Sequence, residues 1–438
     1  MFEQYNRYKD SGIEWLGKIP EDWELDRIKN IGSVRARVGW KALKASEYVE
    51  KSKYIFIATP NIKYKEIDFK NVNYLTKERY EESPEIMLTV GDILLTKDGS
   101  TLGTINIVKY LPSKTTVNSS IAVLRFKTIN HDFVFYQIKS TYIQNIIQLK
   151  KDGAGVPHLF QKDINNFTLL LPKLATQKRI VTYLDKEIQK IDKDIVLLEQ
   201  KVERYKELKE TLVNEVVLRG LDKEVKLKDS GIVWMGNIPN SWQVMRLKEL
   251  VKTIISGGTP TSSNELYWSN GTINWCNIRD MGKNRILLKT SKKITQLGYI
   301  NKNLKMIPCE TILYSIYATL GRVNITQIET TINQAILAIF ENKRKVNKYY
   351  LAFYLEVIEK NIMLFANFNT QYNLNADIVK RFNIVVPPIV EQIKIVNYLN
   401  VKTQKIDKIV KTIETKIELQ KEFRKTLIND VVTGKVKV

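Results

Sequence analysis

Apolar side chains recur most regularly along residues 172–217, in alternating steps of four and three positions. This spacing is the heptad pattern of a coiled-coil helix, in which one apolar face turns toward a partner about every 3.5 residues. The predicted seam of this helix consists of Leu184, Ile188, Ile191, Ile195, Leu198 and Val202. Residues 387–432 repeat the pattern, with the predicted seam Leu399, Ile406, Val410, Ile413 and Ile417. A helix of about 40 residues would span roughly 60 Å.

The segments outside these helices contain short apolar runs bounded by Gly, Pro or Asn. YIFIATPNI (54–62), GDILLTKDG (91–99) and SIAVLRF (120–126) are typical of buried strands, whereas DFVFYQIKSTYIQNIIQ (132–148) has helical spacing. A second set of runs follows in the same order: CETILYSIYATLGRVNIT (309–326), NQAILAIF (333–340) and KYYLAFYLEVIEKNIM (348–363). The patterns therefore predict two domains of mixed α/β structure.

The chain is an internal duplication. KDSGIEWLGKIPEDW (9–23) returns as KDSGIVWMGNIPNSW (228–242). The matching anchors of the two helical segments include Gln177 with Gln392, Tyr183 with Tyr398 and Asn214 with Asn429. The repeat predicts a lead-in at 1–22, a domain at 23–171, a helix at 172–222, a second lead-in at 223–241, a second domain at 242–386 and a helix at 387–438.

Each predicted helix needs a partner for its apolar seam. The candidates are the other copy in the same chain or a helix of a second molecule, and the duplication favours the first. If the pair is antiparallel, a pseudo-two-fold axis relates the two halves, although the seam alone does not decide the direction. We expect the α/β (α+β) class, with two mixed α/β domains separated by a pair of long antiparallel coiled-coil helices.

Composition adds a candidate partner. The 438 residues, of which 44% are hydrophobic, are enough for two or three ordinary cores. Lys and Arg outnumber Asp and Glu by 69 to 47, and the formal net charge of +22 favours polyanions such as nucleic acid. Solubility alone is an alternative explanation of the charge. If the basic face binds phosphates, affinity should fall steeply with added salt.

The sequence favours a cytoplasmic protein without a metal site or a membrane partner. The start, MFEQYNRYKD, lacks the apolar region of a signal peptide, and no run reaches the about 18 apolar residues of a membrane span. The only cysteines are Cys276 and Cys309, and the only histidines are His131 and His158. Because none of them has ligand-like spacing, we expect neither a structural metal nor a disulfide framework.

Several motifs stand in a fixed order along the two halves: SGIEWLGKIPEDW, RVGWKALKASEY, GDILLTKDGSTLG, SGGTPTSSNELYW, INWCNIRDM and PPIVEQIKIVNYL. Their order and duplication, over essentially the whole chain, resemble the specificity subunit of type I restriction-modification enzymes. The first copy departs from the family wording, because PKLATQKRI stands where the second copy has Pro387, Pro388, Glu391 and Gln392. This departure concerns how tightly the start of the first helix is capped.

The resemblance implies that each mixed domain is a target-recognition domain that reads one half of a split, asymmetric DNA target, and that the helices fix the gap. It implies a non-catalytic subunit that binds double-stranded DNA and two methyltransferase subunits, which methylate adenine at N6. Two motor-nuclease restriction subunits would join the full complex and cleave unmodified DNA. The chain itself would bind no cofactor, because S-adenosylmethionine, ATP and magnesium would belong to its partners.

The absence of known catalytic motifs from the sequence independently supports a non-catalytic subunit. The sequence has no GxxxxGK[ST] phosphate loop, no Asn-Pro-Pro-aromatic quartet for amino-methyl transfer and no histidine placed for general-base work. Glu85, Asp92 and Asp98 are candidates for a magnesium nuclease site, but Asp98 in KDGS is more simply a turn residue. A fused nuclease or methyltransferase is therefore disfavoured.

Exposed polar and basic residues on the loops are the candidates for DNA contact, since Arg and Lys bind guanine and phosphates, and Asn and Gln read adenine. The candidates in the first domain are Arg35, Arg37, Lys41, Lys63, Lys97 and Ser100. Those in the second domain are Thr259, Thr261, Asn277, Arg279, Tyr317 and Arg322. Two further hypotheses fit parts of the sequence: a freestanding architectural DNA-binding protein and a coiled-coil scaffold that binds only proteins.

Overall fold

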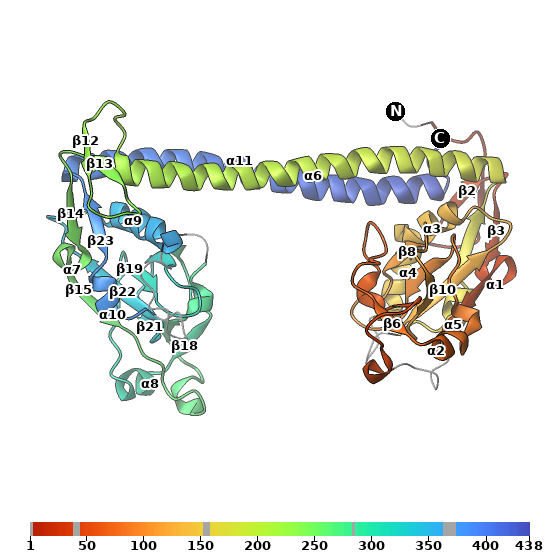
Figure 1. Ribbon diagram of the computed structural model, residues 1–438, viewed down its shortest axis with the longest axis horizontal. Helices are drawn as coiled ribbons and strands as arrows, with labels where there is room; N and C mark the ends of the chain where they lie inside the picture. The colour runs from red at the N-terminus through yellow and green to blue at the C-terminus, as the bar shows by residue number, and fades with distance from the viewer. Residues whose placement is uncertain (1–2, 38–43, 152–157, 283–284, 362–373) are drawn as a thin grey trace. The chain divides into compact units, whose positions relative to one another are not determined.

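The structure is a computed structural model that describes residues 3–37, 44–151, 158–282, 285–361 and 374–438. It consists of two compact units (Figure 1). Unit 1 contains Met1–Glu199 and Glu414–Val438, and unit 2 contains Gln200–Ile413. Each unit therefore holds one lead-in, one mixed domain and one part of each long helix.

Both lead-ins form a small antiparallel hairpin. In unit 1 it consists of β1 (Tyr8–Asp10) and β2 (Lys18–Pro20), and in unit 2 of β12 (Leu227–Asp229) and β13 (Asn237–Pro239). The tryptophan that ends each repeated motif, Trp23 or Trp242, is fully buried. The repeated sequence thus provides the same anchor in both units.

The domain of unit 1 is built on a four-stranded antiparallel sheet in the order β4-β10-β7-β8, a three-stranded sheet β6-β5-β9 and the pair β11-β3. Its strands are β3 (Glu24–Arg27), β4 (Gly32–Arg35), β5 (Tyr54–Ile57), β6 (Asn73–Leu75), β7 (Ile93–Thr96), β8 (Ile105–Ile107), β9 (Lys114–Val117), β10 (Ile121–Phe126) and β11 (Thr168–Leu171). Its α-helices are α1 (Ile28–Ile31), α2 (Lys77–Glu81), α3 (His131–Lys139), α4 (Thr141–Lys151) and α5 (Gln161–Asn165). One hydrophobic core joins the two larger sheets through Ile55, Ile57, Leu94 and Val123.

The domain of unit 2 has the corresponding sheets β15-β22-β19-β20-β17 and β18-β16-β21 and the pair β14-β23. Its strands are β14 (Gln243–Arg246), β15 (Val251–Ser256), β16 (Ile273–Cys276), β17 (Ile286–Leu287), β18 (Lys292–Ile294), β19 (Ile312–Ser315), β20 (Val323–Thr326), β21 (Thr331–Ile332), β22 (Ile336–Glu341) and β23 (Asn383–Val386). Its α-helices are α7 (Leu247–Leu250), α8 (Gln296–Asn301), α9 (Lys348–Asn361) and α10 (Ala376–Lys380). Alternate residues of β19 face different cores, because side chains of a strand point to opposite faces: Leu313 packs with Cys276, whereas Ile312 and Tyr314 pack with α9. The mixed α/β class and the duplicated fold are confirmed.

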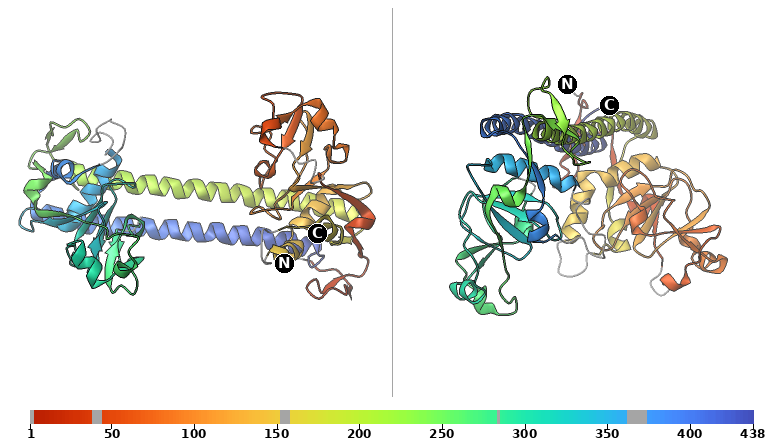
Figure 2. Two further views of the ribbon diagram at one scale, coloured as in Figure 1. Left: turned by 90° about the horizontal axis from the view of Figure 1, so that it is seen from below. Right: turned by 60° about the vertical axis from the view of Figure 1, so that its left-hand side comes forward.

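The two long helices are α6 (Leu174–Arg219) and α11 (Ile389–Val432). Within each unit their segments lie side by side in all views (Figure 1, Figure 2). In unit 1, Arg424 of α11 forms an ion pair with Asp192 of α6. In unit 2, the Lys209 ammonium of α6 lies 2.7 Å from Asp407 of α11. From the first pair to the second, α6 advances by as many residues as α11 goes back, so the expected antiparallel pairing within the chain is confirmed.

The seam residues lie where the heptad pattern places them. Leu184, Ile191, Ile195, Val202, Leu399, Ile406, Ile413 and Ile417 are buried. Ile188, Leu198 and Val410 are half-buried. Because an a/d seam excludes water only where two helices meet, this burial follows from the pairing of α6 with α11.

A buried glutamine joins each long helix to its domain. In unit 1 the Gln177 side chain accepts a hydrogen bond from the backbone N–H of Asn130 at 3.0 Å and donates one to the carbonyl of Pro172 at 2.8 Å. In unit 2 Gln392 makes the same two bonds, with Asn347 at 2.7 Å and with Pro387 at 2.8 Å. Asn130 caps the start of α3, and the Asn347 side chain accepts from the first turn of α9. The anchor pair Gln177 and Gln392 therefore fixes each domain to the start of a spacer helix.

Candidate nucleic-acid interface

In unit 1 the ends of several strands meet at one edge of the domain. The loop after β7 is joined to the turn before β10, because Lys97 N–H donates to the Ser120 carbonyl at 2.8 Å. Leu159 N–H donates to the Lys97 carbonyl at 2.8 Å, and Asn118 N–H to the Ile57 carbonyl at 2.9 Å. We call the residues gathered here, 35–37, 58–61, 97–103, 118–120 and 158–160, the first loop cluster.

Unit 2 has the equivalent backbone hydrogen bonds, made by different residues. Ile316 N–H donates to Ala335 at 2.8 Å, Leu374 N–H to Ile316 at 3.2 Å, and Asn333 N–H to Cys276 at 3.0 Å, in each case to the backbone carbonyl. We call residues 257–261, 277–280, 316–321 and 333–335 the second loop cluster. Since backbone hydrogen bonds hold the loops of both clusters together, the side chains there can differ without loss of the loop arrangement.

Three predicted residues of the first domain lie in the first loop cluster on accessible positions. Arg35 is exposed at the end of β4, and Ser100 is exposed in the loop after β7. Lys97 is half-buried, and its ammonium lies 3.1 Å from a carboxylate oxygen of Asp98. A hydrogen bond also joins Asp98 to His158 Nδ1. Asp98 is thus more than the simple turn residue that the sequence suggested.

Arg37 differs from the expectation of an exposed side chain, because only 4% of it is accessible. Its guanidinium donates to the carbonyl of Val117 at 3.4 Å and to the hydroxyls of Ser83 at 3.2 Å and Thr116 at 3.4 Å. Burial lowers the pKa of this guanidinium. Arg37 therefore stabilises the domain from inside, and the prediction that it is an exposed DNA contact is wrong for this structure.

The other two candidates of the first domain lie elsewhere. Lys63 is exposed further along the connection from β5 to β6, just beyond the first loop cluster, and its N–H donates to the Glu66 carbonyl at 3.1 Å. The next residue, Tyr64, stacks against Arg424 of α11, with 4.5 Å from the guanidinium carbon to the ring centroid. Lys41 lies outside the described residues.

In the second domain, Thr259, Thr261 and Tyr317 lie in the second loop cluster, with Thr261 and Tyr317 exposed. Asn277 and Arg279 belong to the same cluster and follow the end of β16; Arg279 is exposed, whereas the Asn277 side chain is hydrogen-bonded locally. Its oxygen accepts from Arg279 N–H at 2.8 Å and its amide donates to the Ser291 hydroxyl at 3.1 Å.

Arg322 is half-buried just before β20. Its guanidinium donates to the Met281 carbonyl at 3.0 Å, so at least part of its donor capacity serves the fold. Whether the exposed candidates of either domain contact DNA stays a prediction.

The sequence interpretation missed the turn that precedes the central strand in each domain. Its middle residue is Ser119 in unit 1 and the exposed Gln334 in unit 2. The exposed Phe160 was missed as well. The available signal was the matching position of both turns directly before SIAVLRF and AILAIF, but single loop residues carry no periodicity that marks them.

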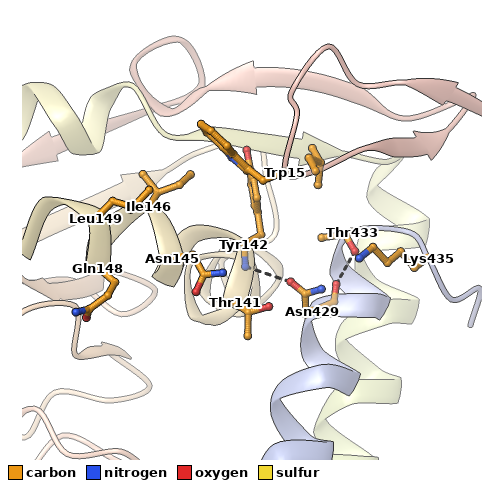
Figure 3. Close-up of a pocket in the computed structure, with 11 residues that line it drawn as sticks. Trp15, Thr141, Tyr142, Asn145, Ile146, Gln148, Leu149, Asn429, Thr433 and Lys435 are labelled. Atoms are coloured by element: carbon orange, nitrogen blue, oxygen red, sulfur yellow. Dashed lines mark hydrogen bonds between the residues drawn. The ribbon is translucent and has the colours of Figure 1, made fainter. Parts of the chain in front are cut away.

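A separate cavity of about 510 Å³ lies in unit 1 between the lead-in, α4 and the end of α11 (Figure 3). Trp15 and Leu149 line it and are 65% and 70% exposed. On the opposite wall the Asn429 side chain accepts a hydrogen bond from Tyr142 N–H at 3.1 Å (Figure 3). The cavity is thus a partly apolar surface beside the lead-in, distinct from the loop clusters.

Among the residues that the structure describes, no group of three or more His, Cys, Asp or Glu side chains is arranged to hold a metal ion. None of the described helices combines the length and the apolar character that a membrane crossing requires.

Comparisons with known proteins agree with this architecture. The model of the family described as "Type I restriction modification DNA specificity domain" matches twice, at residues 20–201 and 239–419. A putative type I restriction enzyme MjaX specificity subunit of Methanocaldococcus jannaschii is 26% identical, over 97% of this chain and 96% of the relative. The MjaVIII specificity subunit of the same organism is 25% identical, over 98% of this chain and 97% of the relative.

Two solved structures have the same fold. One, from work on complex assembly and conformational transition of the type I R-M system, has a TM-score of 0.72 at 18% identity and covers 94% of this chain and 98% of its own. The HsdS subunit from Thermoanaerobacter tengcongensis has a TM-score of 0.54 at 18% identity and covers 98% of this chain and 100% of its own. With two matches that together span most of its length, the chain belongs to the type I restriction modification DNA specificity domain family.

Proposed function

We propose that this chain is the subunit that gives a type I restriction-modification enzyme its DNA specificity, with residues 23–171 reading one half-site and residues 242–386 the other. A role in DNA target recognition follows from the family. The observation that carries the division into two half-sites is the pair of loop clusters. The same backbone bonds hold both clusters, yet their side chains differ, as two different target sequences require.

The long helices are proposed to set the gap between the half-sites. α6 contains 46 residues and α11 contains 44, so each is roughly 65–70 Å long. Insertion of one heptad into both helices at paired positions keeps the seam and lengthens each helix by about 10 Å, or about three base pairs. We expect the gap in the target to grow accordingly. Seven residues inserted into the loop 222–226 are the matched control, and an unchanged gap in the helix variant contradicts the role as a ruler.

Two methyltransferase subunits are the proposed protein partners. Exposed apolar side chains at equivalent places of the two helices support this pairing: Leu208 in unit 2 is 53% exposed and Phe423 in unit 1 is 48% exposed. An apolar side chain that recurs at an exposed position of a duplicated helix is consistent with a duplicated partner. Leu208→Glu or Phe423→Glu alone should leave one bound methyltransferase, and both together none, by native mass spectrometry. Lys201→Glu is the control.

The chain is proposed to have no catalytic step and no cofactor of its own. N6-adenine methylation and cleavage of unmodified DNA, with S-adenosylmethionine, ATP and magnesium, would be functions of the methyltransferase and motor-nuclease subunits. The chain would contribute double-stranded DNA binding and the placement of those subunits.

The deciding experiment is co-expression with a type I methyltransferase subunit from the same genome, followed by mapping of N6-methyladenine across the host genome at single-base resolution. The proposal predicts one split motif with two defined halves and a fixed gap, methylated on both strands. Methyltransferase expressed without this chain is the control and should produce no motif. A continuous motif, or none from a stable complex, overturns the proposed function.

A further inference from the structure

The turn Asn333–Gln334–Ala335 is held more firmly than an ordinary surface turn. Asn333 N–H donates to the Cys276 carbonyl at 3.0 Å, and Ile336 N–H donates to the Asn333 carbonyl at 3.2 Å. The Asn333 side chain accepts from Ala335 N–H at 3.1 Å, and the Ala335 carbonyl accepts from Ile316 N–H at 2.8 Å. The backbone on both sides of Gln334 is therefore tied to two neighbouring strands, while the Gln334 side chain is exposed.

The Gln334 amide is also held at its oxygen. The Thr259 hydroxyl donates a hydrogen bond to Gln334 Oε1. Gly258 N–H, one residue before Thr259, donates to the Ile332 carbonyl at 2.9 Å. A Cβ at Gly257 would lie 2.1 Å from the same carbonyl oxygen, so only glycine lets this segment lie against the turn. The two glycines of the SGGTP motif (256–260) thus allow the Thr259 hydroxyl to reach the Gln334 side chain.

The remaining hydrogen-bonding capacity of Gln334 has a definite pattern. With one lone pair of Oε1 occupied by Thr259, the amide keeps one acceptor position on Oε1 and two donors on Nε2. One donor beside one acceptor matches the major-groove edge of adenine, which offers N7 as acceptor and N6–H as donor. Guanine offers two acceptors there, and cytosine only a donor, so neither base satisfies both positions.

Unit 1 provides an internal comparison. Three backbone hydrogen bonds around its turn correspond to those in unit 2. They run from Asn118 N–H to the Ile57 carbonyl, from Ile121 N–H to the Asn118 carbonyl and from Lys97 N–H to the Ser120 carbonyl. The middle residue there is Ser119. Because the same backbone hydrogen bonds form with Ser119 in unit 1 and Gln334 in unit 2, the turn does not require glutamine at this position, which leaves its side chain to serve a different target base.

We propose that Gln334 determines specificity by reading an adenine in the half-site bound by the second domain, and that Thr259 is its positioning residue. This inference rests on the proposed function as a DNA specificity subunit. It assigns one residue to one base and adds a residue that the sequence interpretation did not include.

The test uses the full chain in complex with its methyltransferase, and genome-wide N6-methyladenine mapping gives the motif of each variant. Gln334→Ala should lose discrimination at one adenine of the second half-site by roughly 5- to 150-fold, the range for one bidentate base contact, and leave the first half-site unchanged. Gln334→Glu should shift that position from adenine to cytosine, because a carboxylate accepts from cytosine N4 and cannot donate to N7.

Thr259→Val should weaken the same position only, and Thr259→Ser should restore it, since serine keeps the hydroxyl. A merely structural role of Thr259 would instead alter stability without changing one base. Gln327→Ala, an identical change at the exposed Gln327 just beyond β20, is the matched control and should keep the wild-type motif.

Two results overturn the inference in distinguishable ways. If the wild-type complex gives a split motif and Gln334→Ala gives the same motif with every base intact, the assignment of Gln334 is wrong while the proposed function stands. If the wild-type complex gives no split motif, the proposed function fails and the inference fails with it.

Discussion

The two units share the backbone hydrogen bonds that hold their loops together, but they carry different side chains in the loop clusters. In the first cluster, Asp98 forms an ion pair with Lys97 and a hydrogen bond with His158. In the second cluster, the neutral side chains of Thr259 and Gln334 are hydrogen-bonded to each other instead. By contrast, Gln177 and Gln392 make the same bonds beside the helices. The comparison teaches that the helix-facing side of each domain keeps the same hydrogen bonds in both units, while the side chains at the strand ends differ, as the proposed division into two half-sites would lead us to expect.

The strongest test of this comparison exchanges a whole domain. Replacing residues 23–171 by the matching block of a relative should replace one half-site completely and leave the other half and the gap unchanged, because the helix-facing bonds are retained. The methylation motif of the hybrid is the measurement, and the reciprocal exchange of 242–386 is its control. A motif altered in both halves would show that the units do not read independently.

Removing a joining glutamine should have the next largest effect. Gln392→Ala leaves buried backbone groups at Asn347 and Pro387 without partners and should lower the free energy of unfolding by about 3 kcal/mol. Gln177→Ala should cost about 2 kcal/mol, since Gln392 also donates to the Lys345 carbonyl at 3.2 Å. Urea unfolding measures both, with the exposed Gln404→Ala as control. Losses no larger than that of the control would contradict the role of these glutamines.

The cluster around Tyr64 distinguishes unit 1 by its pH dependence. The Lys139 ammonium lies 4.1 Å from the centroid of the Tyr64 ring, and burial, together with Arg424, lowers the pKa of Lys139 to about 8 while Asp192 opposes the shift. Above that pH Lys139 is deprotonated in the folded state, whereas in the unfolded state it keeps its proton up to the ordinary pKa of lysine. Stability should therefore rise from pH 8 to about 10.5 by about 2 kcal/mol relative to Lys139→Met. Parallel pH profiles of the two proteins in thermal unfolding would rule out this assignment.

The buried tryptophans test a smaller difference between the units. Trp242 Nε1 donates to the Glu391 carboxylate at 2.9 Å, whereas Trp23 Nε1 has no hydrogen-bond partner among the residues described. The repeat places Thr176 where unit 2 has Glu391. Glu391→Thr should cost about 1–2 kcal/mol, and Thr176→Glu should gain up to about 1 kcal/mol by providing an acceptor for Trp23. Chemical denaturation measures both changes. A Glu391→Thr variant that loses no stability, together with a Thr176→Glu variant that gains none, would refute the correspondence.

The smallest expected effect concerns the loops that follow β7 and β19. Both loops end on a left-handed glycine, Gly103 with φ 85° and Gly321 with φ 82°, but the earlier left-handed residue is Gly99 with φ 77° in loop 97–103 and Ala318 with φ 60° in the shorter loop 316–321. A side chain in this region is strained by about 1 kcal/mol, so Ala318→Gly should raise the free energy of unfolding by about 0.5–1 kcal/mol. Ala335→Gly serves as control. A loss of stability on Ala318→Gly would show that its methyl group packs usefully.

The sequence predicted the repeated and periodic features well. The heptads identified α6 and α11, and the start and end of α6 differ from the predicted helix 172–222 by only a few residues, because Pro172 precedes it and Gly220, with φ 81°, ends it. The family followed from repeated motifs. The loop residues were predicted less well: Arg37 is an internal donor, Asn277 is hydrogen-bonded locally and Lys63 lies just beyond the first loop cluster.

What the sequence by itself determined is therefore the duplication, the pair of long helices, the mixed α/β class and the family, because these depend on periods and motifs that recur along the chain. Only the tertiary structure decided which loops share one edge, that α6 and α11 run antiparallel, that Arg37 points inward and that Thr259 meets Gln334. The physical reason is that these features come from hydrogen bonds and close approaches between residues far apart in sequence, which depend on how the strands pair and leave no local pattern.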